Sequence, residues 1–266
     1  MAALAGVAGL SAAMGLPREA NALDWSSLMG GKREGGTGRV KRLEGVAFSN
    51  TRALRENDEV QHGDQIRVPK GSTLVLSLSD DTIFRLVGEA VLNLDIGTRK
   101  SGILSLVRGA MLTVMPPGNR YLVQTSTATI GVKGTVFFNQ TFAPGERTAT
   151  NWDDRQIAIP EGATNYVCLC VGEIDYLLPG AAEPFMEGSS SFHNAYYVNE
   201  ANANPLVRAP LINHRDSDIA MLIDLQDGPK HESDWLPEYN RSYLTRPWSP
   251  DSKDLPTTVK RITPGV

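Results

Sequence analysis

The sequence lacks the motifs by which most hydrolases and thiol enzymes are recognised. It contains no G-x-S-x-G, no H-E-x-x-H and no C-x-x-C, and only two cysteines and four histidines occur among its 266 residues. Its paired acidic residues fall in expected turns or at the start of an expected helix, where solvation and capping account for them. We therefore expect a protein that is not an enzyme.

The sequence also has little excess charge and few long hydrophobic runs. A formal net charge of -4 and an isoelectric point near 5.6 give no support to nucleic-acid binding. The basic run KREGGTGRVKR at residues 32–42 is interpreted as a solvated linker. After residue 22, no stretch approaches about 20 apolar residues, so we expect no membrane span once the N-terminus is processed.

The first 22 residues have the composition of a signal peptide. A run of small apolar residues ends at Ala20-Asn21-Ala22, which has the small-x-small form of a signal-peptidase site, although no Lys or Arg precedes the run. Cleavage there would leave Leu23 as the first residue of an exported, periplasmic protein. Residues 23–38 are polar, rich in glycine and without period, so they are predicted to form a flexible tether.

From residue 39 to residue 143 the pattern indicates β-structure. Short runs of alternating apolar and polar residues are separated by glycine, proline and aspartate turns, and the chain holds 25 glycines and 16 prolines. The spacing predicts a β-sandwich, a barrel or a short β-solenoid, and we favour the sandwich or the solenoid. In STLVLSLSD, Leu74, Leu76 and Leu78 share one face, which predicts an antiparallel strand buried on that face alone.

Residues 144–230 are predicted to form a small mixed β module with one helix. A clear strand covers residues 166–176, and residues 213–228 have the only convincing helical pattern. Asn213 or Asp216 can cap this helix, and the apolar residues of one face are Ile219, Leu222 and Ile223. Residues 231–266 are rich in proline and have no period, which predicts an extended arm or a disordered tail.

The stretch TATIGVKGTVF at residues 127–137 places two glycines inside a run of β-branched residues. Gly131 and Gly134 bracket Val132 and Lys133, a spacing that suits a bulge or bend with a positive φ or a close backbone neighbour. A phosphate-binding loop is disfavoured because the first glycine of that motif is missing and a strand adjoins it. We expect the side chain of Lys133 to be exposed.

The order of these segments resembles the FecR domain, the periplasmic domain of iron-citrate sensing regulators and of many exported relatives. The resemblance covers about residues 39–143. The residues that carry it are Gly63-Asp64, Asp80-Asp81, Arg108-Gly109 and an ending of the type T-x-x-A-x-x-G-x-x-G-T-x-F, here Thr125, Ala128, Gly131, Gly134, Thr135 and Phe137. The resemblance implies that Gly131, Gly134 and Thr135 form a structural turn of the FecR motif.

The resemblance implies a binding or signalling module. The signalling members of the family control a sigma factor through a cytoplasmic segment and a membrane helix ahead of this domain, and the sequence shows neither ahead of residue 39. We therefore expect a non-catalytic module that engages an envelope component, a ligand, or a periplasmic or outer-membrane protein.

Both cysteines lie in YVCLCVGEIDY. Two positions apart on a strand, Cys168 and Cys170 point to the same face with Cα atoms about 7 Å apart, whereas a relaxed disulfide usually needs about 5.5–6 Å. His193 and His214 follow, and two thiolates with two imidazoles could complete a tetrahedral site for zinc or copper(I). The surrounding fragments also look like a C-terminal region that accompanies some exported FecR-domain proteins.

Other interpretations of the cysteine pair stay open. An oxidising periplasm could join the two thiols in a strained disulfide, or the thiols could be packed as small hydrophobic groups beside hydrogen-bonded histidines. A cysteine nucleophile with His193 as its base is a further possibility. These readings leave two alternative functions beside the binding module: a metal-binding sensor or metallochaperone, and a thiol redox protein.

Overall fold

The computed structural model describes residues 35–97, 100–150, 154–177, 186–190, 193–199, 206–227 and 257–261. The predicted signal peptide at residues 1–22, the start of the tether and most of the proline-rich tail lie outside these ranges. Within them, no helix is long and apolar enough to cross a membrane.

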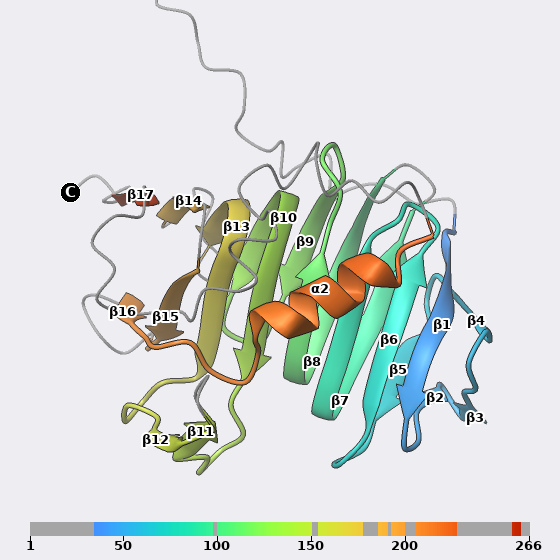
Figure 1. Cartoon of the computed structure of the whole chain (residues 1–266), viewed down its shortest axis with the longest axis horizontal. Helices are drawn as coiled ribbons and strands as arrows, with labels where there is room; N and C mark the ends of the chain where they lie inside the picture. The colour runs from blue at the N-terminus through green and yellow to red at the C-terminus, as the bar shows by residue number, and fades with distance from the viewer. Residues whose placement is uncertain are drawn as a thin grey trace, which may run out of the picture.

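One large sheet of 15 strands dominates the described part of the chain (Figure 1). All its strand pairs are antiparallel except β8 with β9, and a separate hairpin is formed by β11 (Thr148–Thr150) and β12 (Gln156–Ala158). The fold is therefore mainly β, as the sequence predicts. The strands of the large sheet are β1 (Thr37–Glu44), β2 (Phe48–Ser49), β3 (Arg52–Ala53), β4 (Glu59–Gln61), β5 (Gln65–Val68), β6 (Thr73–Leu78), β7 (Ile83–Ile96), β8 (Ser101–Val114), β9 (Arg120–Gln124), β10 (Thr129–Thr141), β13 (Asn165–Leu177), β14 (Met186–Ser190), β15 (Asn194–Val198), β16 (Leu206–Arg208) and β17 (Thr257–Arg261).

Four long strands each contain a glycine with positive φ near the middle. The strand register shifts close to these glycines, between Val87 and Val91 in β7 and between Lys133 and Val136 in β10. Such irregularities bend a strand. The bends divide the sheet into two halves, and each long strand has one segment in each half. The glycines are Gly88 in β7, Gly109 in β8, Gly134 in β10 and Gly172 in β13.

Gly134 explains why the strand TATIGVKGTVF is interrupted. Its φ is +56°, and a Cβ atom there would lie 2.7 Å from the Cα atom of Pro117. Thr135, buried beside it, donates a hydrogen bond from Oγ1 to the carbonyl oxygen of Glu173 at 2.7 Å. Gly131 instead lies in the regular part of β10, opposite Leu122 and Asp175. The motif therefore forms a bend within a strand, and Gly134 is the glycine that requires it.

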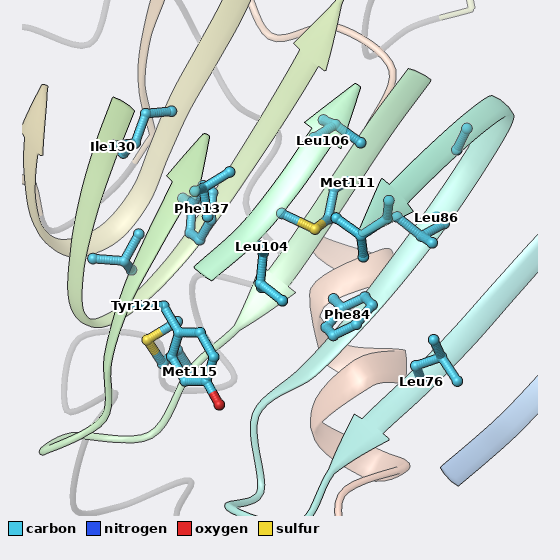
Figure 2. Close-up of a cluster of buried hydrophobic side chains, with 14 of the residues drawn as sticks. Leu76, Phe84, Leu86, Leu104, Leu106, Met111, Met115, Tyr121, Ile130 and Phe137 are labelled. Carbon is cyan, nitrogen blue, oxygen red and sulfur yellow. The ribbon is translucent and has the colours of Figure 1, made fainter. Parts of the chain in front are cut away.

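The two halves of the sheet enclose an inner core. Side chains from both halves of β7, β8, β10 and β13 belong to one continuous apolar cluster. Figure 2 shows part of it, with Leu86, Met111 and Phe137 among the side chains that converge from β6 to β10.

A second cluster, the outer core, lies on the opposite face of one half of the sheet. Helix α2 (Asp216–Asp224) lies across this face (Figure 1) and buries Ile219, Leu222 and Ile223 against it. The predicted helix and its apolar face are therefore confirmed. Arg215 is the N-cap, and its backbone N–H donates to Oδ2 of Asp218 at 2.9 Å.

Helix α2 also overturns the prediction that β6 is buried on one face alone. Leu74, Leu76 and Leu78 point into the inner core as expected, but Val75 is 1% exposed and belongs to the outer core. The prediction was wrong because the cover of the second face comes from a helix far along the chain.

The ends of the predicted segments differ from the sequence boundaries. Strand β1 begins at Thr37, and the backbone N–H of Gly36 donates to the carbonyl oxygen of Ile96 at 2.9 Å, so the last residues of the predicted tether belong to the sheet. Strand β17, within the predicted tail, pairs with β14.

The predicted Cys/His module continues the sheet of the FecR-like segment. Strand β13 pairs with β10 from Thr129 opposite Leu177 to Thr141 opposite Asn165. Residues on both sides of the predicted boundary at residue 143 therefore share one sheet and both cores.

Candidate metal centre

Three separate elements bring both cysteines and two histidines together under helix α2. Cys168 and Cys170 lie two positions apart on β13, so both side chains point into the outer core. His193 directly precedes β15, which pairs with β13, and its backbone N–H donates to the carbonyl oxygen of Cys170 at 2.8 Å. His214 lies in the loop that leads into α2. We call these four residues the Cys/His cluster.

The four side chains of the Cys/His cluster converge on one point. Their sulfur and ring nitrogen atoms all lie within 4.8 Å of one another, and all four residues are buried. The two Sγ atoms are 3.9 Å apart. Sγ of Cys168 lies 3.4 Å from Nδ1 of His193, and Sγ of Cys170 lies 3.5 Å from Nε2 of His214.

These separations match the edges of a tetrahedral zinc site. Zn–S bonds of about 2.3 Å and Zn–N bonds of about 2.0–2.1 Å place tetrahedral ligands about 3.8 Å apart for two sulfurs and about 3.6 Å apart for sulfur and nitrogen. The observed values of 3.9 Å, 3.4 Å and 3.5 Å lie close to them. Three of the six ligand pairs therefore already have tetrahedral spacing, and the other three, which are separated by no more than 4.8 Å, would close in around a zinc ion.

The outward-facing nitrogen of each histidine has its own partner. Nε2 of His193 lies 2.7 Å from Oδ1 of Asp216, and Nδ1 of His214 lies 2.7 Å from the carbonyl oxygen of Ile212. The ring of His214 also stacks on Phe138, with centroids 4.4 Å apart. A carboxylate or carbonyl acceptor of this kind fixes the tautomer and orientation of a metal-ligating histidine.

The protonation of the metal-free cluster also favours a thiolate. Burial alone would raise the pKa of the Cys168 thiol, but the hydrogen bond from Cys170 and the charge of His193 outweigh it and hold that pKa well below its usual range. Burial would lower the pKa of His193, but the Cys168 thiolate and the hydrogen bond to Asp216 raise it to about 9. Burial and the neighbouring Cys168 raise the pKa of Cys170. These opposite shifts favour a thiolate at Cys168 beside a protonated His193 when no metal is bound.

The enclosure of the cluster limits its chemistry. Cys168 and Cys170 are both 0% exposed, so a protein thiol or a bulky substrate cannot reach the sulfur atoms. A pocket of about 270 Å³ borders His214 and the start of α2, and neither cysteine lines it. Four protein ligands would fill a tetrahedron completely, and such closed sites hold metal for structure instead of activating a substrate.

The structure places Lys133 differently from the sequence prediction. Lys133 lies in β10, and its Nζ atom pairs with Oδ2 of Asp175 at 2.9 Å. Side-chain exposure is 19% for the lysine and 6% for the aspartate. The prediction of an exposed turn residue was wrong because β13 brings a buried carboxylate beside it.

Sequence reasoning missed the role of Asp216. The sequence predicted Asn213 or Asp216 as the helix cap, and this was wrong, because Arg215 is the N-cap and Asp216 is the first residue of α2. Its contact with His193 depends on how β15 and α2 pack together, which no local pattern reveals. The one available signal is its position two residues after His214.

Comparison with known proteins identifies a FecR-type segment. Residues 64–151 match the family described as FecR protein, so the resemblance seen in the sequence is confirmed for that part of the chain. The match begins later than the predicted start at residue 39 and ends beyond residue 143. All members of the Cys/His cluster lie outside it.

A comparison with solved structures found a protein from Parabacteroides distasonis that is described as a candidate anti-sigma factor. The two chains share 16% identity with a TM-score of 0.39, over 55% of this chain and 59% of the other. The chain thus matches less than two thirds of that structure. A comparison with curated proteins found no match.

Proposed function

We propose that this protein is an exported, non-catalytic FecR-type regulatory protein that binds zinc in the Cys/His cluster. The match of residues 64–151 to the FecR family supports a signalling regulatory module. The composition of residues 1–22 supports export to the periplasm, where the partner would be an envelope component or a periplasmic or outer-membrane protein.

The convergence of four ligand atoms within 4.8 Å of one another, with three pairs at tetrahedral spacing, is the observation that carries the zinc proposal. A donor set of two sulfurs and two nitrogens in this geometry suits zinc. A soft thiolate pair also suits copper(I), which is the second candidate ion. Complete burial of both cysteines favours an ion that is retained over one that is passed on, so a sensor fits better than a metallochaperone.

The test is metal analysis combined with thiol counting on mature protein prepared from the periplasm without chelator. We expect about one zinc per chain, two thiols that react only after denaturation with a chelator, and an N-terminus at Leu23. Absence of both zinc and copper, with two free thiols, would overturn the metal centre. A stable Cys168–Cys170 disulfide would instead support the thiol redox alternative.

The Cys170→Ser variant adds a matched check because serine keeps the volume but is a poor zinc ligand. We expect its zinc content to fall in proportion to the loss of affinity, while the FecR-type segment stays folded. Unchanged zinc content in this variant would place the ion elsewhere.

A further inference from the structure

We propose that Asp216 is a positioning residue that orients His193 for zinc and thereby couples occupancy of the metal centre to the seating of helix α2 on the sheet. This inference rests on the proposed zinc centre. It goes beyond that proposal because it names the element through which the bound ion would act on the rest of the protein.

The first step is the contact between Asp216 and His193. The side chain of His193 is 0% exposed and that of Asp216 is 13% exposed, so their 2.7 Å contact is largely shielded from water. With Nε2 directed at the carboxylate, the ring presents Nδ1 to the cluster, 3.4 Å from Sγ of Cys168. Losing the carboxylate would free the ring to rotate away from the ligand position.

The second step is that Asp216 is also the first residue of α2. Helix α2 covers the outer core through Ile219, Leu222 and Ile223. Arg85 of β7 pairs with Asp218 at 2.6 Å, and Nε2 of Gln226 donates to the carbonyl oxygen of Asp81 at 2.9 Å. The helix is therefore held at both ends, and at its N-terminal end the contact of Asp216 with His193 adds to the ion pair of Asp218 with Arg85.

The third step follows from linkage. His214 is a member of the Cys/His cluster and lies two residues before the start of α2. Asp216 contacts the cluster through His193. If zinc fixes both histidines, it favours the seated helix, and the seated helix raises the affinity for zinc by the same factor. Loss of zinc would loosen α2 first and expose the apolar face that it covers. Helix α2 is thus the element that reports whether metal is bound.

The experiment compares Asp216→Ala, Asp216→Asn and the control Asp218→Asn in the full chain. Asp216→Asn keeps an oxygen acceptor for His193 but removes the negative charge. Asp218→Asn removes a negative charge from the same helical turn and leaves Asp216 in place. The readouts are zinc affinity, the visible spectrum of the cobalt(II)-substituted protein, and hydrogen exchange of residues 216–227 with and without zinc.

We expect Asp216→Ala to lower zinc affinity by about 10–100-fold and to change the cobalt spectrum. Asp216→Asn should recover much of this affinity, because the hydrogen bond matters more than the charge. Asp218→Asn should keep the wild-type spectrum, because Asp218 pairs with Arg85 and with the backbone of Arg215, and it should lose less affinity than Asp216→Ala. Zinc should slow exchange in α2 of the wild type and of Asp218→Asn, and should slow it much less in Asp216→Ala at equal occupancy.

Two different failures can be distinguished. If the wild type takes up no zinc or cobalt, the proposed metal centre itself is wrong. If the wild type binds zinc but Asp216→Ala keeps the same affinity, spectrum and zinc-dependent exchange, the centre stands and the positioning role is wrong. Equal losses of affinity and equal spectral changes in Asp216→Ala and Asp218→Asn would also overturn it, because they would indicate an effect of helix charge alone.

Discussion

The inner and outer cores of this protein are built in different ways. The inner core joins apolar side chains from both halves of the bent strands. The outer core depends on the segment that carries α2, and its centre contains two cysteines and two histidines. Burial of apolar surface stabilises the first, whereas the second combines burial with polar groups that cost free energy unless they are partnered. The comparison suggests a permanent scaffold on one face and a ligand-dependent cover on the other.

The largest expected effect separates the two cores through the metal. At a free zinc concentration a thousand times the dissociation constant, zinc should stabilise the protein by about 4 kcal/mol. Cys170→Ser should lose most of this stabilisation, as measured by thermal unfolding with zinc. With a chelator, wild type and variant should unfold at similar temperatures, and a large difference that persists there would mean that Cys170 matters for packing and not for metal.

A smaller effect is expected at the bend that supports the inner core. Gly134→Ala would force a side chain into positive φ and place Cβ 2.7 Å from the backbone of Pro117, so it should destabilise the protein by about 3 kcal/mol. Gly118 provides a matched control, since it also has positive φ but its Cβ would meet nothing within 4 Å. Gly118→Ala should cost about 1 kcal/mol in chemical denaturation. Equal costs for the two variants would contradict the close approach to Pro117.

Next in size is the ion pair between Lys133 and Asp175. Lys133→Ala removes the ammonium group that pairs with the Asp175 carboxylate, whose side chain is 6% exposed. We expect the free energy of unfolding to fall by about 2 kcal/mol. Adding Asp175→Asn should recover part of this loss, because no buried charge then remains. Chemical denaturation of the single and double variants measures the coupling, and a silent Lys133→Ala would restore the interpretation of this lysine as an exposed residue.

The smallest effect concerns pH in the zinc-free protein. The lowered pKa of Cys168 contributes stability that is complete above the unfolded value of about 8.5 and is lost as pH falls toward the folded value. The pKa of His193, raised to about 9, contributes stability that is complete below the unfolded value and is lost as pH rises through about 9. The two slopes oppose each other between about pH 6.5 and 8.5, so stability should change little there and fall on either side.

The ultraviolet absorbance of the thiolate tests the lowered pKa of Cys168 directly. A thiolate should be present in the zinc-free wild type well below pH 8.5 and should be absent in Cys168→Ser. If absorbance appears only above the ordinary thiol pKa, the buried ion pair does not form.

The sequence was most informative where local periodicity decides the structure. The alternation of a strand placed both cysteines on one face, and the helical spacing of Ile219, Leu222 and Ile223 identified the buried face of α2. Both inferences need only the geometry of a single element. The FecR motif, with its interrupted strand, likewise indicated a backbone irregularity at Gly134.

Features that depend on two distant elements were not accessible in this way. The burial of Val75 requires knowledge that α2 covers β6, and the pairing of Lys133 requires knowledge that β13 lies beside β10. The contact of Asp216 with His193 needs the packing of β15 against the start of α2. Residue type suggested that His193 and His214 could join the cysteines, but only the fold places their nitrogen atoms within 4.8 Å of the sulfurs.

The most direct test of the central claim is X-ray absorption at the zinc edge of the purified protein. We expect a four-coordinate zinc with two sulfur ligands at about 2.3 Å and two imidazole nitrogens at about 2.0–2.1 Å. A zinc surrounded only by oxygen and nitrogen would contradict the assignment of Cys168, Cys170, His193 and His214 as its ligands.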